Sequence, residues 1–72
     1  MAMHVRISEP ALLPDLIDSF LRNNCVAQPV GKDSCLVVHV HACHADEAWR
    51  EVAFFLGAWQ IRHPGVSAVA TR

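Results

Sequence analysis

The sequence predicts one α+β domain, because strand-like and helix-like segments alternate along the chain. The best strand candidate is the stretch 35–41, Cys-Leu-Val-Val-His-Val-His, in which β-branched and apolar residues alternate with histidine. Apolar residues recur at helical spacing over 13–21 and again over 46–62. With 72 residues and no recognisable linker or repeat, we expect a single domain over residues 1–72.

The strand over 35–41 is expected at the centre of a sheet, with its alternate side chains on opposite faces. The more hydrophobic set should face the core, and it consists of Leu36, Val38 and Val40. The other set should lie on the open face, and it consists of Cys35, Val37, His39 and His41.

The first half of the chain predicts a strand, a helix and an edge strand. Met3 to Ile7 alternates apolar and polar residues. Ser8 is placed to cap a helix that begins at Pro10, or that becomes regular only near Pro14 after an irregular turn. This helix should end at 23–24, Asn-Asn, and the strand over 25–30 contains a proline that suits a sheet edge.

The second half predicts a long helix and a final strand. The helix runs from about Asp46 to Arg62 and should end before the Pro-Gly pair at 64–65. Val66 to Ala70 is the last strand candidate. The residues expected to be buried are Leu16, Phe20, Val38, Val40, Val52, Leu56 and Trp59.

The resulting order, strand–helix–strand–strand–helix–strand, resembles the βαββαβ ferredoxin-like split fold. The resemblance implies a four-stranded antiparallel sheet in the order 4-1-3-2, with both helices on one face and the first and third strands at the centre. It covers nearly the whole chain but rests on no motif. Because this fold serves many unrelated functions, it does not indicate one here.

Composition disfavours several classes of function. The net charge is −1, and a nucleic-acid binder needs an excess of basic residues to neutralise phosphates. The predicted strands also lack the aromatic residues on which RNA bases stack. We expect no membrane segment, because no apolar run approaches the roughly 20 residues that span a bilayer. The three cysteines lack the spacing of a disulfide framework, so we expect reduced thiols in a cytoplasmic protein.

The densest group of potential metal ligands is His39, His41, Cys43 and His44. Two histidines two positions apart on a strand point the same way and could share Zn²⁺ or Cu²⁺. The group lacks the spacing of structural zinc sites, so we expect no structural metal and no cofactor. The alternative is a ligand- or metal-binding regulatory module that uses an open sheet face bearing these histidines together with His4 and Arg6.

No residue pattern indicates an enzyme. Cys43 and His44 are adjacent, and adjacent side chains usually diverge, whereas a nucleophile needs its base within hydrogen-bonding distance. The acidic residues lie at solvent-facing helix positions, and the chain has no glycine-rich phosphate loop. We therefore predict no catalytic residues.

The long helix carries a second apolar stripe, made of Phe54, Ala58 and Ile61, on the side away from its core face. At 53% hydrophobic residues, the chain has more apolar side chains than two layers can hide. We predict a homodimer that uses this stripe, and hence a small non-enzymatic interaction domain whose partner is itself or another protein. The open sheet face is the less favoured surface, because its histidines and Arg6 would be buried without partners.

Overall fold

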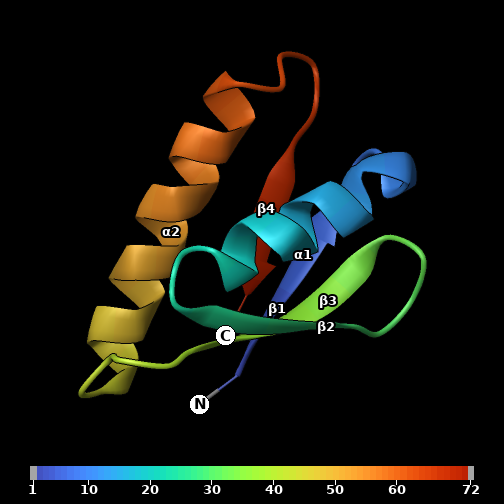
Figure 1. Ribbon diagram of the computed structural model, residues 1–72. Helices are drawn as coiled ribbons and strands as arrows, with labels where there is room; N and C mark the ends of the chain where they lie inside the picture. The colour runs from blue at the N-terminus through green and yellow to red at the C-terminus, as the bar shows by residue number, and fades with distance from the viewer. Residues whose placement is uncertain (1, 72) are drawn as a thin grey trace.

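The computed structural model describes residues 2–71 and shows an α+β domain with one antiparallel sheet. Its strands are β1 (Met3–Ile7), β2 (Cys25–Pro29), β3 (Ser34–His39) and β4 (Ala68–Thr71). Its helices are α1 (Leu13–Leu21) and α2 (Ala45–Ile61), and a 3₁₀ turn, η1 (Pro10–Leu12), precedes α1. The strand order is β2-β3-β1-β4, so β1 and β3 are central as predicted (Figure 1). This arrangement is compatible with a ferredoxin-like fold.

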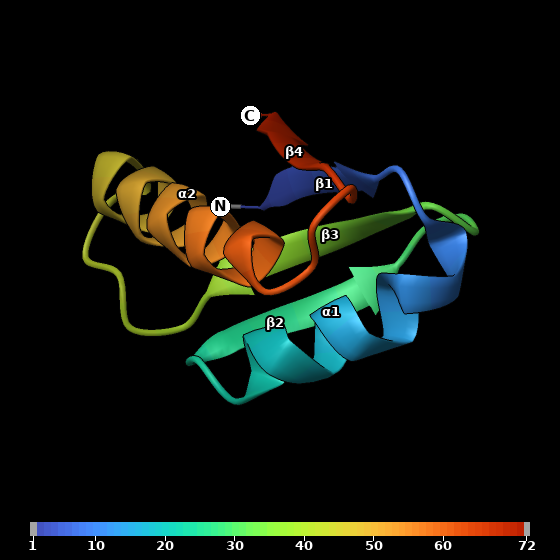
Figure 2. The same cartoon turned by 90° about the horizontal axis from the view of Figure 1, so that it is seen from above.

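Both helices pack against the same face of the sheet, with α1 over β2 and α2 over β3 and β4 (Figure 2). From β1, the side chains of Met3, Val5 and Ile7 enter the layer between sheet and helices and are buried. The predicted helical core is confirmed, since five of the expected residues are buried there: Leu16, Phe20, Val52, Leu56 and Trp59.

The prediction for β3 is wrong in its choice of face. Cys35 and Val37 are fully buried, whereas Leu36 and Val38 are 39% and 38% exposed on the open side. Val40 is also exposed, because the strand ends at His39 and Val40 lies in the following turn. The predicted core positions of Leu36, Val38 and Val40 are therefore wrong, and so are the predicted open-face positions of Cys35, Val37 and His39.

The pairing of β3 with β1 explains this choice of face. Val37 lies opposite Met3, and Cys35 lies opposite Val5. Directly paired residues of an antiparallel sheet point to the same side, so the buried face of β1 fixes the buried face of β3. The inward residues of β3 are small, which leaves room for large side chains such as Phe20 and Trp59 from the helices.

The irregular start of α1 is confirmed. The chain forms the η1 turn first, and Pro14 then lies within the first turn of α1, where no helical N–H bond is lost. The predicted capping role of Ser8 is wrong. Its hydroxyl oxygen instead accepts a 2.9 Å hydrogen bond from the Ser67 amide, which joins the end of β1 to the start of β4. After α1, Asn24 takes the left-handed conformation at φ 62°, consistent with the predicted stop.

Helix α2 has a well-defined beginning and end. At its start, the Glu47 amide donates to Nδ1 of the N-cap residue His44 at 3.3 Å. The Cys43 amide, one residue before the cap, donates to Glu47 Oε1 at 3.2 Å, so the arrangement is similar to a capping box. At its end, Gly65 turns the chain at φ 86°. The last strand begins two residues later than predicted, at Ala68. Within residues 2–71, neither helix has the length and apolar character needed to cross a membrane.

Candidate functional site

The outer side of α2 carries the two most exposed large apolar side chains of the described residues. Phe54 and Ile61 are each 80% exposed, and Ala58 between them is also exposed. The predicted stripe is therefore present on the surface, and its role as a contact remains a prediction. With Gly57, which lies beside Ala58 on the exposed side, we call these four residues the α2 surface.

The contacts within residues 2–71 do not explain why position 57 is a glycine. A methyl group added there would meet nothing within 4 Å, and its backbone is helical. Glycine inside a helix is about 1 kcal/mol less favourable than alanine. Gly57 was not singled out from the sequence, although a glycine inside a helical pattern lowers stability and can have a packing or functional reason.

Two unpaired charges lie along one flank of the α2 surface. Glu51 and Arg62 are both exposed, and neither side chain forms an ion pair with another residue of the range 2–71. They are eleven positions apart, which places them only about 20° apart around the helix axis. Both therefore border the same side of the apolar stripe.

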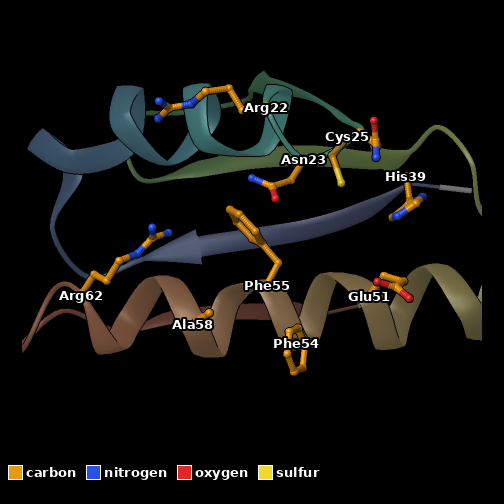
Figure 3. A pocket seen from close by; sticks show the side chains of 10 residues that line it. Arg22, Asn23, Cys25, His39, Glu51, Phe54, Phe55, Ala58 and Arg62 are labelled. Carbon is orange, nitrogen blue, oxygen red and sulfur yellow. The ribbon is translucent and has the colours of Figure 1, made fainter.

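A groove of about 590 Å³ separates α2 from the C-terminal end of α1 (Figure 3). Phe55 extends from α2 towards α1 and packs against Phe20, with the ring centres 4.5 Å apart and the rings tilted by 34°, which forms the floor of the groove. Towards one end lie Arg22 and Arg62, and towards the other lie Cys25, His39 and Glu51. Arg22 is held by Asp18 at 3.1 Å.

Cys25 and His39 face each other across β2 and β3, which makes them the cysteine–histidine pair that sequence reasoning missed. Burial, and to a smaller extent the charge of Glu51, raises the pKa of the Cys25 thiol. Burial likewise raises the pKa of Cys35 to about 11. Since the thiolate is the nucleophilic form, both thiols are in their unreactive protonated state at neutral pH.

The four predicted ligand residues do not form one cluster. His39 lines the groove, and its Nδ1 accepts from the His41 amide at 3.2 Å in the turn that ends β3. Cys43 is exposed, and His44 caps α2. Side chains alternate between the two faces of the sheet only within the strand, and β3 ends at His39. His41 lies in the following turn and therefore does not share a sheet face with His39. Among residues 2–71, no three His, Cys, Asp or Glu side chains are placed to hold a metal ion.

The open sheet face is more apolar than we predicted. Val26, Leu36, Val38 and Val69 are exposed on it, together with Arg6, and His4 is half-buried among them. Arg6 lies 3.9 Å from Asp33 in a loose, exposed ion pair. His39 lies on the helix-facing side and His41 lies beyond the end of β3, so two of the four polar residues that we expected on this face are not part of it, and His4 and Arg6 remain.

A polar cluster fixes the end of α2 against α1. The Trp59 indole nitrogen donates to Asp15 Oδ2 at 3.2 Å, and the His63 ring stacks on Trp59 with centres 4.0 Å apart. His63 Nδ1 lies 2.9 Å from the Trp59 carbonyl oxygen, and its Nε2 lies 3.6 Å from Asp15 Oδ2. With Trp59 fully buried, this cluster anchors α2 and holds its outer surface in a fixed orientation.

Comparisons with protein-family models, with curated proteins and with solved structures give no match.

Proposed function

We propose that this domain is a non-enzymatic interaction module that self-associates as a homodimer through the α2 surface. The observation that carries the proposal is the 80% exposure of both Phe54 and Ile61 on a helix whose opposite side is buried. Large apolar residues exposed side by side on a rigid helix are typical of a contact surface. The raised pKa of Cys25 further supports a non-catalytic role.

The size of the α2 surface indicates a weak dimer. Full burial of a large apolar side chain contributes about 1.5–3 kcal/mol, and a symmetric dimer would bury Phe54 and Ile61 from both copies. Association itself costs at least about 4 kcal/mol in lost freedom of motion. A contact made by one helix falls at the lower end of interface sizes, below about 1,200 Å² in total, where complexes dissociate readily.

The open sheet face is a second candidate surface for the same function. Its four apolar residues favour it, and the absence of His39 and His41 from it weakens the objection to burying polar groups there. We place it second because Leu36 and Val38 are already more than half covered by their neighbours, and because His4 and Arg6 lie among them. The α2 surface has no polar side chain at its centre.

We also propose that the domain has the split βαββαβ arrangement of the ferredoxin-like fold. The order of elements along the chain and the central positions of β1 and β3 support this assignment.

Sedimentation velocity over a range of protein concentrations tests the dimer. We expect the mass of the parent to rise towards twice 8.0 kDa, and Phe54→Glu or Ile61→Glu to remain a folded monomer. Val26→Glu and Val69→Glu place the same charge on the open sheet face and serve as matched controls that keep the parent's behaviour. If only the controls become monomeric, the sheet face is the interface; if the parent is monomeric at every concentration, the proposal fails.

A further inference from the structure

We infer that the partner of the α2 surface is a second copy of α2 in antiparallel orientation, with the two-fold axis passing between Gly57 and Ala58. This inference rests on the proposed function and specifies its geometry. It follows from three features: the spacing of Phe54 and Ile61, the small residues between them, and the unpaired charges on one flank.

The large residues are placed symmetrically about the point midway between Gly57 and Ala58. Phe54 and Ile61 each lie 3.5 positions from that point, which is about 5 Å along the helix. A two-fold axis there, perpendicular to the plane of the two helices, brings Phe54 of one copy level with Ile61 of the other. Both large residues of each copy then have an apolar partner across the contact.

The small residues lie where the two helices would cross. Gly57 and Ala58 are both exposed, and no described residue occupies the space beside Gly57. Small residues at a crossing let two helix backbones approach closely, so the large side chains on either side can interdigitate. A close approach of a second copy supplies the reason for a glycine that the isolated chain does not explain.

The flanking charges complement each other under the same axis. Glu51 lies about 10 Å before the axis, and Arg62 lies about 7 Å after it. The rotation reverses the direction of the helix but leaves each charge on the same flank of the contact. Measured along the helix axis, Glu51 of one copy therefore lies within about 3 Å of Arg62 of the other copy. Two equivalent ion pairs result, and both groups lack such a partner within residues 2–71 of one chain.

Parallel packing of the same surface would not form these ion pairs. Its two-fold axis runs along the helices and exchanges the two flanks, so the charges of the two copies would lie on opposite sides of the contact. Glu51 therefore meets Arg62 only in the antiparallel orientation, which the charges favour.

The test is a charge exchange between Glu51 and Arg62, read by sedimentation and native mass spectrometry. Glu51→Arg alone and Arg62→Glu alone should each weaken self-association by about tenfold, because each replaces two ion pairs by two repulsions. Mixing the two variants should restore association at the parent's affinity. In the mixed dimer, the arginine introduced at position 51 of one chain meets the glutamate introduced at position 62 of the other, and the unaltered Glu51 meets the unaltered Arg62.

Glu9→Arg and Lys32→Glu reverse charges outside α2 and should leave association unchanged, alone or mixed. If Phe54→Glu yields a monomer but the charge variants associate as the parent does, the α2 surface is used without the antiparallel geometry, and this inference fails alone. Single variants that are weakened but not rescued by mixing also contradict it. A parent that never associates overturns both this inference and the proposed function.

Discussion

The inner and outer sides of α2 carry similar residues in opposite surroundings. Val52, Leu56 and Trp59 face the sheet and are almost completely buried, whereas Phe54 and Ile61 are mostly exposed. The inner side is explained by the fold of one chain, because it fills the layer between helix and sheet. The outer side is not needed for that purpose. Under the proposed dimer, this difference means that one helix carries stability on its inner side and interaction on its outer side.

The sharpest separation of the two sides comes from truncating one residue on each. We expect Leu56→Ala to lower the free energy of unfolding by about 2–5 kcal/mol, through lost burial and a residual cavity. Phe54→Ala should change it by less than about 0.5 kcal/mol in dilute solution, where the proposed weak dimer is dissociated. Urea unfolding followed by tryptophan fluorescence measures both. Equal losses for the two variants would contradict the distinction.

The two faces of β3 offer the same comparison within the sheet. We expect Val37→Ala to destabilise the domain by about 2 kcal/mol, because Val37 is fully buried beneath the helices. Val38→Ala should have less than half that effect, since Val38 is 38% exposed on the open sheet face. Urea midpoints of the two variants, measured side by side, check the assignment. A larger loss of stability for Val38→Ala than for Val37→Ala would indicate that β3 has the opposite orientation.

Gly57→Ala should raise the stability of the monomer and weaken its self-association. We expect the monomer to become more stable by about 1 kcal/mol, because alanine favours the helix and the added methyl group has free space. Self-association should weaken, since the methyl group would hold the two helices apart. Thermal unfolding in dilute solution and sedimentation at high concentration measure the two effects. A variant that associates more tightly would show that Gly57 is not at the crossing.

The helices and the order of elements could be predicted from the sequence, but the orientation of β3 could not. Leu16 and Phe20 in α1, and Val52 and Leu56 in α2, recur at helical spacing, so periodicity identifies their buried sides. In β3 both alternate sets are apolar, and the more hydrophobic set is the exposed one. Pairing with β1 decides between them, and pairing is a non-local property.

The candidate site was also only partly accessible from sequence. Phe54, Ala58 and Ile61 stand out on a helical wheel, because their spacing is local. The contact between Asp15 and Trp59 joins residues 44 positions apart, and the pairing of Cys25 with His39 depends on strand register. From the sequence, His44 was considered only as a potential metal ligand, in a group where we expected no structural metal, and its role as a helix cap became apparent only in the structure.

The most direct test of the central claim is a dilution series followed by amide chemical shifts in two-dimensional NMR of the parent protein. We expect concentration-dependent shifts at Phe54, Gly57, Ala58 and Ile61, with none at Val26, Leu36, Val38 and Val69 on the open sheet face. Shifts confined to the sheet face, or spectra that do not change with concentration, would contradict the account.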